Sequence, residues 1–114
     1  CGAKRFEVYF DQDQARLTNA AREAISLTAT QLQGCDVTKV QVLGLADARS
    51  GTAAANQTLS EQRARSVAEA LTVVGLPAPA FEVTGAGAEG AKVNGVNDPL
   101  RRRTEVLIEA RPRT

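Results

Sequence analysis

The 114-residue chain contains no histidine, methionine or tryptophan, and only one tyrosine and three phenylalanines. The absence of histidine removes the commonest general base and metal ligand, so most classes of enzyme and metal site become poor candidates. The charges nearly cancel, with 14 Lys and Arg against 13 Asp and Glu, so no strong field favours nucleic acid or an anionic membrane. No apolar run approaches the roughly 20 residues that a membrane-spanning helix requires. These absences favour a domain that needs no metal or cofactor and binds no nucleic acid.

The length and composition indicate one folded domain over residues 1–114. With 43% hydrophobic and 24% charged residues, the chain has the composition of a globular protein. Hydrophobic periodicity predicts elements in the order β-α-β-α-β-β, which indicates an α+β two-layer sandwich with two helices on one face of a mixed four-stranded sheet. The expected elements are a strand over 6–10, a helix from the N-cap Thr18 to Gly34, a strand over 39–45, a helix that begins near Asn56 or Ser60 and ends at Gly75, and strands over 81–84 and 104–109. The first helix is expected to bury Ala21, Ile25, Thr28 and Leu32, with Ala24 and Leu27 beside them.

Two segments with suggestive motifs are interpreted as loops. The G-x-G-x-x-G pattern at 85–90 follows a strand, but no helix can begin directly after it, as dinucleotide binding would require. Residues 85–98 are therefore expected to form a long surface loop. The run Arg101–Arg103 lacks interleaved aromatic residues, which indicates ion pairing or a local ligand and not nucleic acid.

Asp47 and Arg63 form a more specific constellation. Asp47 comes just after the strand at 39–45, Arg63 lies in the early turns of the next helix, and a loop of small residues joins them. An acid beside a guanidinium complements a zwitterion, because the acid can bind an ammonium group and Arg63 can hold a carboxylate with two hydrogen bonds. An ordinary ion pair across the loop explains the same spacing.

Several segments, in the same order along the chain, resemble the OmpA-like peptidoglycan-binding domain. They are Val8–Asp13 with Ala15–Thr18, Val40–Asp47, Asn56–Ala64 with Val67, Leu71 and Gly75, and Arg101–Val106. The most specific of them is Asn-x-x-Leu-Ser-x-x-Arg-Ala, at 56–64. The resemblance implies a non-enzymatic module of the periplasm, associated with the outer membrane, that holds the cell wall without a covalent bond.

In the family that the chain resembles, the ligand is the diaminopimelate residue of the peptidoglycan stem peptide. The resemblance places Asp47 against its ammonium group and Arg63 against its carboxylate, in an accessible cleft. The other expected contacts are Phe10, Asp11, Arg49, Asn56, Leu59, Arg102 and Arg103.

Several positions depart from the family's pattern: Ser50–Gly51 replaces its usual Gly-Ser in a loop that is one residue longer, and Arg101 stands where it usually has Asn. Leu45 and Ala46 stand where the family usually has His and Thr, and Ala55 stands where it usually has Tyr. These changes remove side-chain donors and an aromatic wall around the expected pocket. The alternative is therefore a divergent domain that keeps the fold and serves protein–protein interaction or assembly in the envelope.

Cys1 allows two interpretations. Some members of the family that the chain resembles are lipoproteins whose mature chain starts with a lipidated cysteine, and a lipid on Cys1 would be the chain's contact with a membrane. However, few residues separate Cys1 from the first strand, so the tether to the wall would be short. A disulfide with Cys35 is favoured instead, since the first helix should return towards the start of the first strand.

Overall fold

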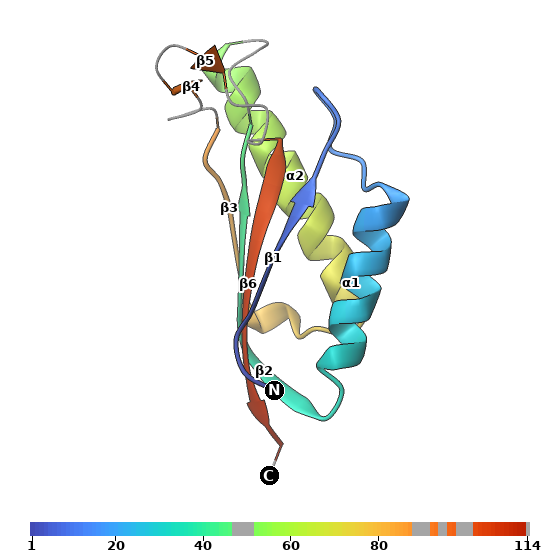
Figure 1. The fold of residues 1–114 in the computed structure, drawn as a ribbon. Coiled ribbons are helices and arrows are strands. Elements are labelled where there is room, and N and C mark those ends of the chain that lie inside the picture. The colour runs from blue at the N-terminus through green and yellow to red at the C-terminus, as the bar shows by residue number, and fades with distance from the viewer. Residues whose placement is uncertain (47–51, 88–91, 94–95, 98–101, 114) are drawn as a thin grey trace.

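The computed structural model describes residues 1–46, 52–87, 92–93, 96–97 and 102–113, and these form two layers. Two helices pack on one face of a mixed four-stranded sheet, which confirms the expected α+β architecture (Figure 1). The elements in chain order are β1 (Lys4–Tyr9), α1 (Asn19–Gln31), β2 (Cys35–Gly44), α2 (Ala53–Val73), the short 3-10 helix η1 (Ala78–Ala80), β3 (Phe81–Gly85), β4 (Lys92–Val93), β5 (Val96–Asn97) and β6 (Arg103–Pro112).

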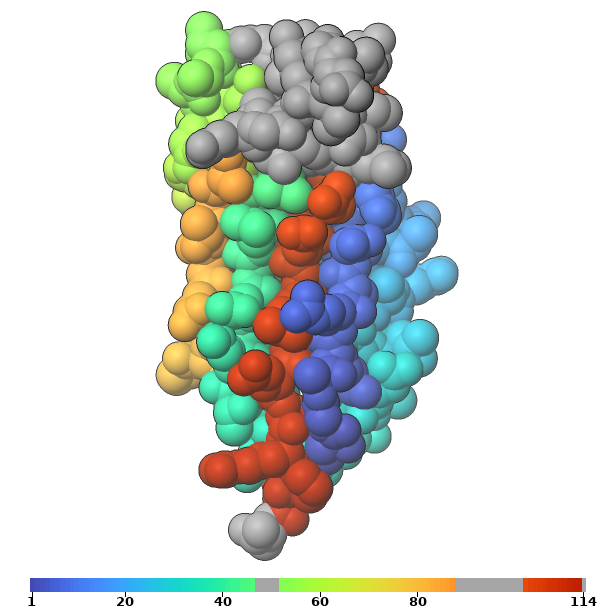
Figure 2. All heavy atoms as spheres, turned by 60° about the vertical axis from the view of Figure 1, so that its left-hand side comes forward, coloured from blue at the N-terminus to red at the C-terminus, as the bar shows by residue number. Residues whose placement is uncertain are grey.

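The sheet has the strand order β1-β6-β2-β3. β2 and β3 are parallel, whereas β6 runs antiparallel to both β1 and β2. Figure 2 shows the four strands side by side on the face that the two helices leave open. Every second residue in the first half of β6 faces the helices and is buried, namely Thr104, Val106 and Ile108.

The observed strands differ from the predicted ones mainly in length. β2 begins at Cys35, four residues before the predicted start at Lys39, and a register shift between Val37 and Lys39 interrupts its pairing with β6. The polar residues at the start of β2 disguise the strand in the sequence. Within the predicted loop at 85–98, β4 and β5 pair as a two-stranded antiparallel sheet. The prediction of a long surface loop is therefore wrong for these four residues, and also for Gly85, which is the last residue of β3.

The first helix follows the prediction closely. The Thr18 hydroxyl accepts a hydrogen bond from the Ala21 N–H at 3.1 Å, as an N-cap should. The expected stripe of Ala21, Ile25, Thr28 and Leu32 is buried. Leu27 is 59% exposed, so the expectation that it broadens the stripe is wrong. Its position on the helix turns it towards solvent and away from the sheet.

The second helix begins earlier than predicted. α2 starts at Ala53, where the Thr52 side chain caps it by accepting from the Ala55 N–H at 3.1 Å. Alanine has the highest helix propensity, so the run of alanines that resembled a flexible loop forms the first turn. Asn56 and Ser60, the predicted caps, lie inside the helix and are buried. The prediction of the start of α2 is therefore wrong by three residues or more.

Two glycines let α2 lie directly on the sheet. A Cβ atom on Gly44 would come within 1.8 Å of the Ser60 carbonyl oxygen, and one on Gly85 within 2.7 Å of the Glu61 nitrogen. Since no side chain can occupy such a gap without moving the backbone, the two residues fix how closely the helix approaches the ends of β2 and β3.

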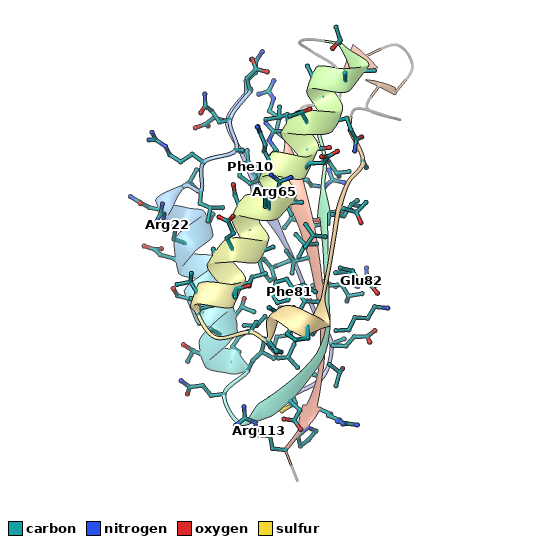
Figure 3. All side chains as sticks on the ribbon, turned by 180° about the vertical axis from the view of Figure 1, so that it is seen from behind. Phe10, Arg22, Arg65, Phe81, Glu82 and Arg113 are labelled. Atoms are coloured by element: carbon teal, nitrogen blue, oxygen red, sulfur yellow. A yellow bond between two sulfur atoms is a disulfide. The ribbon has the colours of Figure 1, made fainter. Side chains whose placement is uncertain are left out.

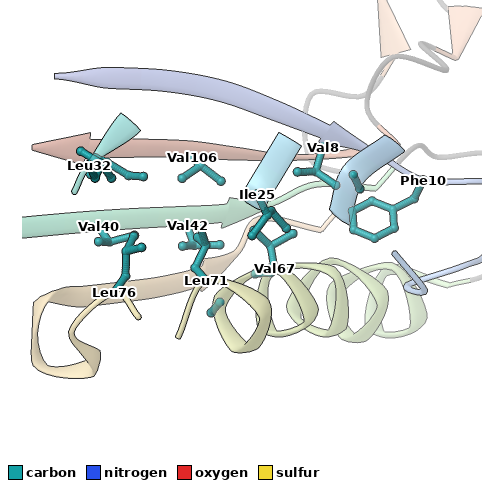
Figure 4. Close-up of a cluster of buried hydrophobic side chains, with 14 of the residues drawn as sticks. Val8, Phe10, Ile25, Leu32, Val40, Val42, Val67, Leu71, Leu76 and Val106 are labelled. Carbon is teal, nitrogen blue, oxygen red and sulfur yellow. The ribbon is translucent and has the colours of Figure 1, made fainter. Parts of the chain in front are cut away.

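The hydrophobic core lies between the helices and the sheet (Figure 4). It joins side chains from both helices and from β1, β2 and β6. Its fully or nearly buried members include Val8, Phe10, Ile25, Leu32, Val40, Val42, Val67, Leu71, Leu76, Val106 and Ile108.

A disulfide between Cys1 and Cys35 ties the N-terminal segment to the start of β2, with 5.7 Å between the two Cα atoms. The Gly2 N–H also donates to the Ala110 carbonyl at 3.1 Å, which holds the same segment against β6. The favoured disulfide is thus confirmed. The sulfur of Cys1 is bonded to that of Cys35 in this structure.

Candidate functional site

Arg63 lies on α2 close to the end of β2, and its side chain is fully buried. Its Nε donates to the Gln14 carbonyl at 2.8 Å, Nη1 to the Leu45 carbonyl at 3.0 Å, and Nη2 to the Asp11 carbonyl at 3.1 Å. A buried guanidinium needs such partners because its desolvation is otherwise very costly. Arg63 therefore fastens the segment after β1 and the residue after β2 to the middle of α2.

The segment after β1 is shaped to meet this guanidinium. The Phe10 ring lies under it, with 5.3 Å between the Arg63 Cζ and the ring centroid, a cation–π distance. The Gln14 N–H donates to the Asp11 carbonyl at 3.1 Å, which closes a four-residue turn. Asp13 holds the third position of that turn with φ of 59°, in the left-handed region that Asp tolerates better than most residues. The turn presents the Asp11 and Gln14 carbonyls to Arg63.

Hydrogen bonds between distant segments complete this end of the molecule. Segments next to β1, β2, β3 and β6 meet here beside α2, so the site is built on the sheet and not on one loop. The bonds are Phe10 N–H to the Arg102 carbonyl (2.7 Å), Leu45 N–H to the Arg103 carbonyl (2.9 Å), Ala46 N–H to the Gly87 carbonyl (3.0 Å) and Gly87 N–H to the Ser60 hydroxyl (2.8 Å).

The structure brings together some of the expected contact residues. Phe10 and Asp11 contact Arg63 directly, the first through its ring and the second through its carbonyl. Asn56 is buried on the same side of α2 as Arg63, because seven residues are nearly two turns of an α-helix. Leu59 is half-buried on the same helix.

The terminal arginines lie at the start of β6. Arg102 and Arg103 are both half-buried, and Arg103 Nη2 lies 3.3 Å from Glu105 Oε2. Asp47 and Arg49 lie outside the described residues, so their contact with a ligand stays a prediction. The expected pairing of Asp47 with Arg63 stays a prediction for the same reason.

The burial of Arg63 differs from the accessible guanidinium that the resemblance implies. Backbone carbonyls accept from three of its five N–H donors, and every residue type carries such a carbonyl, so no sequence pattern could identify these acceptors. The same is true of Gln14, which acts through its main chain. Ser60 gave a signal as a candidate helix cap, but its hydroxyl instead accepts from the Gly87 N–H and donates to the Gln57 carbonyl at 2.8 Å.

Of the residues that depart from the family's pattern, Leu45 and Ala46 are buried at this site, whereas Ala55 is exposed. Leu45 and Ala46 are at most 4% exposed, and their main-chain groups form the bonds to Arg63, Arg103 and Gly87. Their apolar side chains therefore pack inside, where a His and a Thr would have supplied polar groups. The neighbouring Thr104 hydroxyl is buried and has no hydrogen-bond partner in the part of the chain that the structure describes.

Neither a metal site nor a membrane-spanning helix is found among the described residues. No three His, Cys, Asp or Glu side chains gather there in an arrangement that could hold a metal ion. No helix in that part of the chain has the length and apolar character to cross a bilayer.

Comparison with known proteins identifies the family to which the chain is similar. The model of the OmpA family matches residues 9–104. Outer membrane protein A of Klebsiella pneumoniae is 32% identical over 103 residues, which are 89% of this chain and 30% of that protein, so the chain spans about a third of this relative.

Two solved structures share the fold. The OmpA-like domain of FopA1 from Francisella tularensis has a TM-score of 0.80 and 23% identity, with 98% of this chain and 77% of that chain covered. The peptidoglycan-associated lipoprotein from Burkholderia pseudomallei has a TM-score of 0.77 and 25% identity, with 93% of this chain and 91% of that chain covered. Sequence and fold agree, and the chain belongs to the OmpA family.

Proposed function

We propose that this domain binds peptidoglycan without catalysis, through the diaminopimelate residue of the stem peptide, in the periplasm beneath an outer membrane. The observation that carries the proposal is a fixed guanidinium at the end of the sheet, in a chain whose family match covers residues 9–104. Arg63 binds the carboxylate of diaminopimelate, and Asp47 binds its ammonium group. A rigid Arg63 favours binding because little side-chain entropy is lost when the ligand arrives.

The carboxylate reaches Arg63 by replacing a backbone carbonyl. Nη2 donates to the Asp11 carbonyl at 3.1 Å, and Asp11 is an exposed residue in a tight turn. A small movement of this turn would free Nη2 for a carboxylate oxygen. A carboxylate adds the attraction between two full charges to a hydrogen bond that the cationic donor already strengthens, which favours the exchange.

Co-sedimentation with purified sacculi tests the proposal. Asp47→Ala should weaken binding about tenfold or more, because a charge-assisted hydrogen bond is removed. Asp36→Ala is the matched control, since Asp36 is an exposed acid at the opposite end of β2, 3.4 Å from Arg113. The proposal fails if the two variants sediment equally, or if the unaltered domain stays in the supernatant.

A second candidate function is protein–protein contact or assembly in the envelope by a domain that no longer binds the wall. The complete burial of Arg63 and the apolar Leu45 and Ala46 beside it favour this alternative. In that case sacculi should not retain the domain at all, and Asp47→Ala should change nothing in the same assay.

A further inference from the structure

β3 is an edge strand with a groove beside it. It pairs with β2 on one side, and no strand in the described part of the chain pairs with its other side. A groove of about 960 Å³ lies between β3 and α2. Val83 on β3 and Val73 on α2 line it and are 45% and 85% exposed. This edge of the sheet therefore has exposed apolar surface and, over residues 81–84, backbone that no neighbouring strand of the described chain pairs with.

The β3 edge lacks the features that usually prevent strand pairing. Edge strands are commonly protected by charged side chains, proline, bulges or a covering element. The other edge strand, β1, carries Lys4, Arg5 and Glu7 among its six residues. β3 carries Glu82 as its one charge, has no proline, and pairs with β2 in regular register over five residues. Gln57 Nε2 donates to the Gly85 carbonyl at 2.7 Å, so the last residue of β3 already has a side-chain partner. Over residues 81–84 an added strand would meet none of these obstacles.

A stripe of α2 side chains borders the groove at a spacing that suits an added strand. The α2 stripe consists of Glu61, Arg65, Glu69 and Val73, each four residues after the last, and all of them line the groove. Four helical residues rise about 6.0 Å, whereas two residues of a strand advance about 6.6–6.8 Å. Every second side chain of a strand beside β3 can therefore face one member of the α2 stripe. Figure 3 labels Arg65 on α2 and Phe81 at the start of β3.

The α2 stripe also carries a charge pattern. No carboxylate oxygen of the described residues lies within 4.0 Å of the Arg65 guanidinium, so no ion pair joins it to the glutamates one turn away in either direction. Arg65 and Glu69 are exposed, and Glu61 is half-buried. The order along α2 is acid, base, acid, apolar. α2 runs opposite to β3, since Gln57, in the second turn of the helix, donates to the carbonyl of Gly85, the last residue of β3, at 2.7 Å.

We propose that the β3 edge binds an extended peptide segment of a partner protein by strand addition. The segment runs antiparallel to β3, and its alternate residues, which face the α2 stripe, are basic, acidic, basic and apolar in that order. Backbone hydrogen bonds to β3 supply affinity, and the α2 stripe supplies specificity, as in other complexes formed by strand addition.

A second copy of the chain suits this edge less well. A stable interface between folded proteins buries about 800 Å² on each partner, more than a five-residue strand contact provides. If two copies paired through β3 about a two-fold axis, their α2 stripes would face one another with Arg65 of one copy near Arg65 of the other. Like charges would then lie close together. A short peptide meets neither difficulty.

Fluorescence anisotropy with a labelled peptide, Lys-Thr-Glu-Thr-Lys-Thr-Leu, tests the proposal. Its odd-numbered residues match the α2 stripe in order. Glu69→Lys should weaken binding about five- to tenfold, because an attraction becomes a repulsion. Changing the second lysine of the peptide to glutamate should restore binding to this variant. Glu23→Lys, an equal charge change at an exposed position on α1, is the control and should leave binding within twofold.

Backbone methylation of the peptide separates strand addition from simple charge attraction. Alternate N–H groups of a strand face opposite sides, so methylating one set should abolish binding and methylating the other should not. The proposal is overturned if both methylated peptides bind like the parent, or if Glu69→Lys and Glu23→Lys weaken binding equally. It is also overturned if sedimentation equilibrium without peptide shows a dimer that Glu69→Lys dissociates, since the occupant is then a second copy.

Discussion

At the scale of single residues, Arg63 is both the expected ligand contact and a structural centre. The sequence alone identified Arg63, because the pattern Asn-x-x-Leu-Ser-x-x-Arg-Ala at 56–64 resembles that of the family. The sequence could not identify its partners, the carbonyls of Gln14, Leu45 and Asp11, because every residue type has a backbone carbonyl. Removing Arg63 therefore changes folding as well as any binding.

We expect Arg63→Met to lower the free energy of unfolding by about 3 kcal/mol or more, because buried carbonyls lose their donor. Methionine keeps much of the side-chain volume, so the loss reports the hydrogen bonds. The measurement is urea unfolding followed by circular dichroism. Arg65→Met, at an exposed position on the same helix, should change stability by at most about 0.5 kcal/mol. If Arg63→Met lowers the free energy of unfolding no more than Arg65→Met does, the hydrogen bonds of Arg63 contribute nothing to stability.

At the scale of elements, the fit between α2 and the sheet decides where the site lies. Periodicity predicted both helices and the four main strands, since the apolar stripes of α1 and β6 are regular. The start of α2 was missed because three alanines and a threonine resemble a loop as much as a helix start. Only the hydrogen bond from the Ala55 N–H to the Thr52 hydroxyl, a matter of geometry, separates the two.

Thr52→Ala should lower the free energy of unfolding by about 1 kcal/mol, the usual effect of removing an N-cap. Thr58→Ala is the control, because Thr58 is an exposed residue inside α2 and alanine is the better helix former. Thermal or urea unfolding of both variants checks this. If Thr52→Ala has no effect, α2 begins later in the chain.

The contact of α2 with Gly44 yields a second prediction at this scale. Gly44→Ala should destabilise the domain by about 2–3 kcal/mol, because the new methyl group would meet the Ser60 carbonyl at 1.8 Å and push the helix away. Gln41→Ala, on the open face of the same strand, is the control and loses one exposed hydrogen bond to Glu82. Similar unfolding midpoints for the two variants would contradict the close packing.

At the scale of the whole molecule, the N-terminal segment and the start of β2, which the disulfide joins, lie at the opposite end of the sheet from the end of β2, where the site is (Figure 1). Cys35 begins β2, and Leu45, which bonds to Arg63, follows its other end. The two ends are joined by a continuous ten-residue strand. We therefore expect changes at the disulfide end to alter stability and not binding, and changes at the other end to alter binding.

Reducing the Cys1–Cys35 disulfide should lower the free energy of unfolding by about 3–4 kcal/mol, the loop-closure estimate for its 34-residue separation. Binding to sacculi should persist while the domain stays folded. Intact mass should rise by about two daltons on reduction, one hydrogen on each sulfur. An unchanged mass would show that the bond is not formed.

The recognition of both charged ends of one cell-wall amino acid is the central claim. Isothermal titration with diaminopimelate and with lysine, which lacks the distal carboxylate, tests it most directly. We predict that lysine binds about tenfold more weakly or worse, because the Arg63 guanidinium then receives no carboxylate. Equal affinity for the two amino acids, or no binding of either, would contradict the account.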